Sequence, residues 1–162
     1  MTSSAISSAL GFALLYAACI IPTARIALTA AAGFTVAVAF LRCGAKHGAA
    51  VFLITAVLGI LMLPLKSPAL LYASLLGYYP LAKSGFERIH NPFVMWTVKL
   101  LLFNVIFIAL YEFTAEFFAE ALRNIAAFRA ATQIIGNAVF VLYDVCLSRL
   151  TGFYISRFSK YI

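Results

Sequence analysis

The sequence predicts an all-α integral membrane protein, a compact bundle of six transmembrane helices. Hydrophobic residues make up 65% of the 162 positions and charged residues only 10%, far less charge than the roughly 25% of a typical soluble domain. The apolar runs are continuous and lack the alternation of a barrel strand, which favours helices. At about 20 residues per span the chain holds five or six helices. Residues 1–162 are therefore expected to form a single transmembrane domain.

Prolines and charged residues mark the ends of the apolar runs. Pro22 ends the first run and Pro64 the third, whereas Pro68 and Pro92 suit the first turn of a helix, where the missing N–H costs nothing. Pro80 is expected to kink or end the fourth helix. The predicted helices span residues 5–21, 25–41, 47–63, 68–82, 92–111 and 130–153.

The segment 111–128 differs from the other runs because it carries three acids. Glu112, Glu116 and Glu120 are spaced at i, i+4 and i+8, which places them on one helical face between apolar residues. This pattern predicts an amphipathic helix at the membrane surface, between the fifth and sixth spans. The three acids are the only cluster that an enzyme could use, and the wet face of an interfacial helix explains them better.

The distribution of basic residues predicts that both termini are cytoplasmic. With the N-terminus inside and six spans, eight bases fall on the inner side and four on the outer side, as the positive-inside rule requires. Arg25, at the outer end of the first helix, is a local exception. The inner bases are Arg42, Lys46, Lys83, Arg88, Lys99, Arg149, Arg157 and Lys160, and the outer bases are Arg25, Lys66, Arg123 and Arg129.

The sequence lacks the motifs that are typical of several classes of protein. There is no hydrolase elbow, phosphate loop or Gly-rich dinucleotide turn. His47 and His90 have no paired ligand, and Cys19, Cys43 and Cys146 fit small packing residues better than a metal site. The basic residues are spread over loops, so we expect no nucleic-acid partner, no cofactor, no metal and no enzymatic activity.

Asp144 lies inside the sixth predicted helix, where an unpaired carboxylate costs at least a few kcal/mol. Lys99 lies about 10 Å into the antiparallel fifth helix from the inner side, at a similar depth. We therefore expect a Lys99–Asp144 ion pair, with Lys83 as the alternative partner. The pair either fixes the helix register or serves as a coupling or proton-linked element.

Intramembrane amides form a second polar group in the outer half of the predicted bundle. Asn104 lies in the fifth helix, and Gln133 and Asn137 share one face of the sixth. Such amides usually bond a neighbouring helix, but here they could also line a cavity open to the outside. Tyr72, near the outer part of the fourth helix, could join them.

Small residues follow one stripe of the first helix. Ala5, Ala9, Ala13 and Ala17 repeat at i+4 spacing, which lets another helix approach closely. That helix belongs either to this chain or to a partner protein.

Taken together, these features resemble the S components of energy-coupling factor transporters, which are small six-helix membrane proteins with cytosolic termini. Members bind a vitamin or other micronutrient from outside and associate with a transmembrane coupling subunit and two ATPases. Their first helix often carries an Ala-x-x-x-Ala motif, matched here by residues 5–9 and 13–17. The resemblance implies a bacterial cytoplasmic membrane protein whose alanine stripe binds the coupling subunit. The ligand would be held near the outer ends of the last three helices by Asn104, Asn137, Gln133, Tyr72 and Glu112.

Two other interpretations stay open. The size and span count also resemble the membrane protein that determines rod shape in bacteria, which would make the chain a scaffold without a ligand pocket. A small ion-coupled carrier is the third interpretation, and it depends on Lys99 and Asp144. The segments 77–88 and 136–144 resemble uncharacterised bacterial membrane proteins, which assigns no function.

Overall fold

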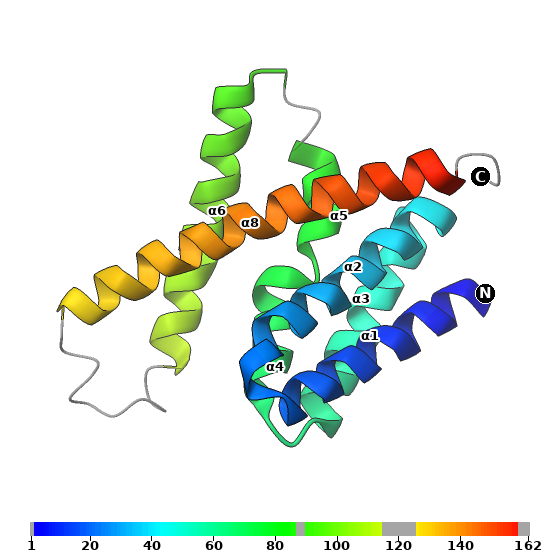
Figure 1. The fold of residues 1–162 in the computed structure, drawn as a ribbon, viewed down its shortest axis with the longest axis horizontal. Helices are drawn as coiled ribbons and strands as arrows, with labels where there is room; N and C mark the ends of the chain where they lie inside the picture. Colours follow the sequence, from blue (N-terminus) through cyan, green and yellow to red (C-terminus); the bar gives the residue numbers. More distant parts are fainter. Residues whose placement is uncertain (1, 87–89, 115–125, 159–162) are drawn as a thin grey trace.

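The computed structural model describes residues 2–86, 90–114 and 126–158, and within these ranges the chain is helical with short connecting turns. Side chains are described for residues 3–86, 90–110 and 130–157. Figure 1 labels the α-helices. The elements in chain order are α1 (Thr2–Ile20), the 3₁₀ turn η1 (Pro22–Ala24), α2 (Arg25–Cys43), α3 (Ala45–Met62), α4 (Lys66–Leu71), the π-helix η2 (Tyr72–Leu76), α5 (Tyr79–Phe86), α6 (Pro92–Thr114) and α8 (Ala126–Phe158).

Within the described residues, five segments are long and apolar enough to cross a membrane. They are Ser3–Ile20, Pro22–Cys43, Ala45–Met62, Pro92–Leu110 and Ala130–Arg157. At 1.5 Å per residue even the shortest, with 18 residues, is about 27 Å long, close to the hydrocarbon thickness of a bilayer. Large apolar side chains point outward from these helices, including Ile6, Leu61, Phe93 and Ile134. The fold is therefore compatible with a membrane protein.

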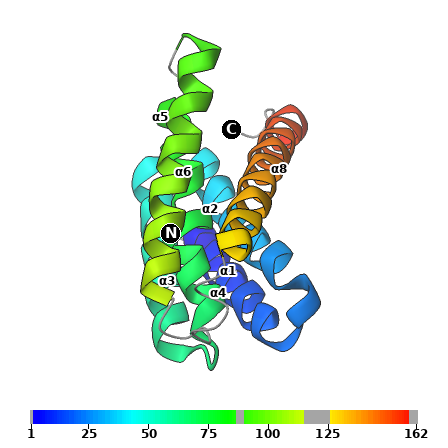
Figure 2. The ribbon, with the colours of Figure 1, turned by 90° about the vertical axis from the view of Figure 1, so that its left-hand side faces the viewer.

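The helices α1, α2 and α3 pack side by side as one bundle (Figures 1 and 2). Small residues and hydroxyls lie at their contact, where Ala32, Thr29 and Thr55 are fully buried. Thr29 donates its hydroxyl to the Arg25 carbonyl at 2.8 Å, so the polar atom is satisfied within its own helix. Small side chains allow close helix packing in lipid, where burial of apolar area gives little driving force.

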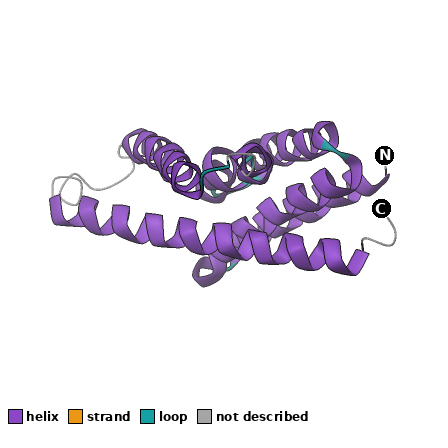
Figure 3. Ribbon diagram, turned by 90° about the horizontal axis from the view of Figure 1, so that it is seen from above, coloured by secondary structure: helices purple, strands orange, loops and turns teal. Residues whose placement is uncertain are grey.

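The long helix α8 lies along one side of the other helices, as Figure 3 shows. Its 33 residues give it a length of about 50 Å, longer than the hydrocarbon layer, so in a bilayer it would tilt or extend beyond the layer. It crosses α6 and contacts α2 (Figure 1), and side chains of α5 bond to it. A second core forms at these crossings from Ala37, Leu75, Leu76, Tyr79, Phe103, Phe140, Tyr143 and Leu147.

The helix expected over residues 68–82, with a kink or an end at Pro80, is interrupted before that proline. The segment is broken into α4, the π-helix η2 and α5, with bends at Gly77 and Tyr78 between η2 and α5. Pro80 does not end a helix, because it is the second residue of α5, where a backbone N–H has no partner within the helix. The helix continues instead to Phe86.

The expected amphipathic helix over residues 111–128 lies largely outside the described residues. Tyr111–Thr114 continue α6, and Ala126–Phe128 begin α8. Glu112 belongs to α6, but its side chain lies outside the described residues, and so do Glu116 and Glu120.

Candidate functional site

Three amide side chains join α6 to α8. The amide nitrogen of Asn104 donates to Asn137 Oδ1 at 3.0 Å, and Asn137 Nδ2 donates back to Asn104 Oδ1 at 3.1 Å. Gln133 also donates to Asn104 Oδ1. The amide nitrogens of the two asparagines also donate to carbonyls of their own helices, Asn104 to Leu100 O at 2.7 Å and Asn137 to Gln133 O at 2.8 Å. The structure thus gathers three of the five predicted ligand-binding residues.

The other two predicted ligand-binding residues are not in this amide group. Tyr72 is fully buried in the core shared with Leu15 and Val36, and its ring centroid lies 5.9 Å from that of Phe52. It therefore belongs to the α1–α3 side of the molecule. The side chain of Glu112 lies outside the described residues.

Aromatic rings lie between this amide group and the charged side chains of Lys99 and Asp144. The rings of Phe103 and Phe140 stack with centroids 4.5 Å apart, Phe107 stacks on Phe103 at 5.3 Å, and Tyr79 meets Phe140 edge-on at 5.0 Å. A cavity of about 90 Å³ adjoins these rings and is lined by Phe103, Phe107, Gly136 and Phe140 together with apolar residues of α2, α4 and η2. The walls of this cavity are apolar.

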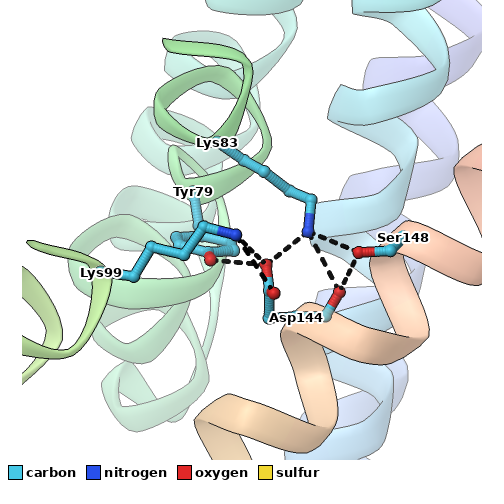
Figure 4. A network of polar contacts seen from close by, with 5 residues as sticks. All are labelled: Tyr79, Lys83, Lys99, Asp144 and Ser148. Atoms are coloured by element: carbon cyan, nitrogen blue, oxygen red, sulfur yellow. Dashed lines mark hydrogen bonds and ion pairs between the residues drawn. The ribbon is translucent and has the colours of Figure 1, made fainter. Parts of the chain in front are cut away.

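A buried charged cluster lies beyond the aromatic rings, where α5, α6 and α8 meet (Figure 4). Asp144 of α8 is 3% exposed, and Lys83 of α5 and Lys99 of α6 are 6% and 2% exposed. Lys99 Nζ lies 3.2 Å from Asp144 Oδ2, and Lys83 Nζ contacts Asp144 Oδ1. Tyr79 donates its hydroxyl to the same Oδ1 at 2.6 Å. One carboxylate therefore receives donors from two other helices.

Lys83 has further partners on α8. Its ammonium donates to Ser148 Oγ at 2.7 Å and to the Asp144 carbonyl at 3.2 Å. Lys99 lies instead near an aromatic ring, with its ammonium 5.3 Å from the ring centroid of Trp96, within the range of a cation–π contact. Pairing, hydrogen bonds and the ring offset the cost of keeping these charges out of water.

Part of this cluster was predicted from the sequence. The Lys99–Asp144 pair is present, and Lys83, considered only as an alternative partner, binds the same carboxylate at the same time. Tyr79 and Ser148 were missed. The signal that could have found them is helical spacing, because Tyr79 lies four residues before Lys83 and Ser148 four residues after Asp144.

An apolar groove of about 500 Å³ runs between α2 and α8. On the α2 side it is lined by residues such as Ile26, Ala27 and Phe34, and on the α8 side by Leu142 and Cys146 among others. Its volume falls in the range of ligand pockets, but it contains none of the predicted ligand-binding residues.

The alanine stripe of α1 faces away from the bundle. Ala5, Ala9 and Ala13 are exposed and Ala17 is half-buried. The opposite face of α1 packs inward through Leu15 and Ala18, both fully buried, and through Gly11, where an added Cβ would lie 2.9 Å from Thr35 Oγ1. The stripe is therefore not used for packing within the described part of this chain.

Comparisons with protein-family models, with curated proteins and with solved structures find no match to this chain.

Proposed function

We propose that this chain is the substrate-binding membrane subunit of a micronutrient importer of the energy-coupling factor type, with six membrane segments and cytoplasmic termini in a bacterial cytoplasmic membrane. The observation that carries the proposal is the group formed by Asn104, Gln133 and Asn137 at the contact of α6 and α8, set apart from the charged cluster by aromatic rings. Neutral amides that donate and accept are suited to orient a small polar molecule by hydrogen bonds, with aromatic rings as walls.

The site as it stands has little free space. The adjoining cavity measures about 90 Å³, whereas ligand pockets usually measure about 300–1,000 Å³. A vitamin-sized ligand would therefore enter only if α6 and α8 separate at the amide group. Each interhelical amide bond in a membrane is worth about 0.6 kcal/mol on average, so ligand bonds could replace the bonds among the three side chains at modest cost.

The outward alanine stripe supports the second half of the proposal, association with a transmembrane coupling subunit and its ATPases. Ala5, Ala9 and Ala13 expose a surface on which a partner helix could pack at short distance. Replacing Ala9 and Ala13 by Leu would keep this face apolar but would hold a partner helix away. We expect the double variant to fold normally and to lose the coupling subunit on affinity purification.

Native mass spectrometry of the protein purified in mild detergent tests the ligand directly. We expect a small molecule bound to the wild-type protein and lost from Asn104→Leu and Asn137→Leu. Thr97→Val is the matched control, because Thr97 lies on the exposed side of α6 and its hydroxyl bonds its own helix, at Phe93 O. A wild-type protein without a small molecule, or amide variants that retain it, would contradict the proposal.

A membrane scaffold is the second candidate, and the groove between α2 and α8 favours it. A groove of about 500 Å³ with apolar walls suits a helix of another membrane protein better than a polar micronutrient. Ala27 lines this groove and is exposed, so Ala27→Phe would fill it. If this variant loses a co-purified membrane protein while no small molecule is ever found, the scaffold replaces the importer subunit as the better interpretation.

A further inference from the structure

Arg149 lies on the outside of α8, within the part of that helix that is apolar enough to cross a membrane. Its neighbours Val145, Leu150 and Phe153 are also exposed, so this base stands in an apolar part of the surface. Charged side chains within membrane segments almost always face the protein interior, where they find a partner. An arginine on the outer face is therefore a candidate site for a group of opposite charge.

The neighbouring helix α2 gives the depth of Arg149. The guanidinium of Arg42, the second-last residue of α2, lies 5.8 Å from the ring centroid of Tyr154 on α8, so Tyr154 marks the level at which α2 ends. Figure 1 shows the end of α2 beside the C-terminal part of α8. Arg149 precedes Tyr154 by about one and a half turns, which is about 7.5 Å along the helix. An arginine side chain can span this distance and place its charge at the headgroup level.

Four other bases of the described helices find partners inside the chain. Lys83 and Lys99 share the carboxylate of Asp144, whereas Arg25 and Lys66 donate to helix carbonyls. For Arg149, the part of the chain that the structure describes provides neither a hydrogen bond nor an ion pair. We therefore expect its counter-charge to come from the surrounding membrane.

The apolar groove between α2 and α8 reaches the turn of α8 that carries Arg149. Cys146 and Leu150, one on each side of Arg149 in the sequence, both line this groove. On α8 the lining residues run from Val139 to Leu150, a distance of about 16 Å along the helix. This length is close to half of the roughly 30 Å hydrocarbon layer, which is the depth that the acyl chains of one leaflet occupy.

The width of the groove limits what it can hold. A volume of about 500 Å³ over a length of about 16 Å gives a mean cross-section of about 30 Å². A helix with its side chains is about 10–12 Å wide, so a partner helix could insert only side chains, whereas a single hydrocarbon chain fits along the whole length. Small residues of α2 make this room, because Ala27, Ala30 and Ala31 line that side of the groove.

We propose that Arg149 and this groove bind one anionic phospholipid, with the phosphate at Arg149 and one acyl chain between α2 and α8. The lipid belongs to the leaflet at the C-terminal end of α8, which is the cytoplasmic leaflet in the proposed orientation. Its phosphate supplies the counter-charge, and the guanidinium can donate two parallel hydrogen bonds to the phosphate oxygens. The site does not depend on the proposed importer function, because a scaffold in the same bilayer would hold the same lipid.

Native mass spectrometry of the full chain tests the site with two lipids that carry the same acyl chains. The protein in mild detergent is titrated with palmitoyl-oleoyl phosphatidylglycerol, which is anionic, and separately with palmitoyl-oleoyl phosphatidylcholine, which has no net charge. We expect the first phosphatidylglycerol to bind about fivefold more tightly than phosphatidylcholine, which is the gain from one base beside an anionic headgroup. Equal affinity of the wild-type protein for the two lipids would overturn the proposal.

Variants of the base separate a specific headgroup contact from the overall positive charge. Arg149→Leu should abolish the preference for phosphatidylglycerol, and Arg149→Lys should retain most of it. Arg157→Leu is the matched control, because Arg157 is an exposed base in the last turn of the same helix. It should leave the preference unchanged. If Arg149→Leu and Arg157→Leu lose the preference equally, net charge alone attracts the lipid and the site is wrong.

A variant of the groove tests the position of the acyl chain. Cys146→Phe should fill the groove, because Cys146 is exposed and lines it, and this variant should lose the tightly bound first phosphatidylglycerol. Val145→Phe is the control, since Val145 is exposed and is not among the lining residues, and it should bind the lipid as the wild-type protein does. Unchanged lipid binding by Cys146→Phe would overturn the proposal. So would a membrane protein that co-purifies with the wild-type chain in place of the lipid and is lost from Cys146→Phe.

Discussion

The contact of α2, η2 and α8 at Gly33 allows a sharp prediction for Gly33→Ala. An added Cβ would lie 2.5 Å from Tyr143 Oη and 2.6 Å from Leu76 O, and both distances would have to lengthen to at least 3.0 Å. The Leu76 oxygen belongs to the backbone, so it cannot rotate away as the end of a side chain can. Either η2 or α8 must therefore shift, and the 2.8 Å hydrogen bond from Tyr143 to Leu76 is strained or lost.

The size of the effect follows from three contributions. Overpacking of a close contact costs about 1–3 kcal/mol. Leaving the buried Leu76 carbonyl without its donor costs about 1–3 kcal/mol. The higher helix propensity of alanine returns about 1 kcal/mol. We therefore expect Gly33→Ala to lower the free energy of unfolding by about 3 kcal/mol.

Unfolding in mixed detergent micelles by titration with dodecyl sulfate, followed by far-ultraviolet circular dichroism, measures this change. Gly152→Ala in α8 is the matched control, because an added Cβ there meets nothing within 4 Å. The control should be neutral or slightly stabilised. Tyr143→Phe supplies a double-mutant cycle, since it removes one of the two clashing oxygens and the hydrogen bond at once.

In the Tyr143→Phe background we expect Gly33→Ala to cost about 1–2 kcal/mol less than in the wild-type protein. Two results would refute the reasoning. One is a stability of Gly33→Ala equal to that of Gly152→Ala. The other is a cost of Gly33→Ala that is the same with and without the Tyr143 hydroxyl.

Three further predictions concern the polar groups and the orientation. Asp144→Asn should lower the free energy of unfolding by about 3–5 kcal/mol, because Lys83 and Lys99 lose a buried counter-charge. The same dodecyl sulfate titration measures this change, and a free energy of unfolding equal to that of the wild-type protein would contradict the charged cluster. The double variant Lys99→Asp with Asp144→Lys should regain only part of the stability lost in either single variant, since a lysine at position 144 would face Lys83. Complete recovery would show that Lys83 does not share the carboxylate. A reporter fused after residue 162 should be active as a cytoplasmic fluorescent protein and inactive as a periplasmic phosphatase, and the reverse pattern would overturn the orientation.

The sequence predicted well where several helices begin and end. The expected spans 25–41, 47–63 and 92–111 agree with α2, α3 and α6 to within a few residues, because proline, glycine and charge mark where an apolar run must end. The position of each residue along its helix also grouped Lys99 with Asp144 and Asn104 with Asn137, because residues at the same level of two neighbouring antiparallel helices lie close together. Both arguments use position along a helix and need no knowledge of its faces.

The sequence failed where the rotation of a helix or an interruption within it decides the contacts. A helix in lipid is apolar all round, so its pattern does not say which side meets the protein. Tyr72 was therefore placed with the amides, whereas it faces Phe52 in the α1–α3 core. The π-helix was missed because the segment Tyr72–Leu76 contains neither proline nor glycine.

The structure also accounts for two bases that oppose the positive-inside rule. Arg25 Nε donates to the Ala18 carbonyl near the end of α1, at 3.4 Å, and Lys66 Nζ donates to the carbonyls of Ile60 and Leu63 at the end of α3, at 2.7 and 3.0 Å. Bases at these places satisfy terminal carbonyls and the negative end of the helix dipole. Because Lys83 and Lys99 are likewise committed to Asp144, all four can be left out of the orientation count. Eight inner and four outer bases then become six and two, so the ratio of inner to outer bases, which favours cytoplasmic termini, rises from two to three when these four bases are left out.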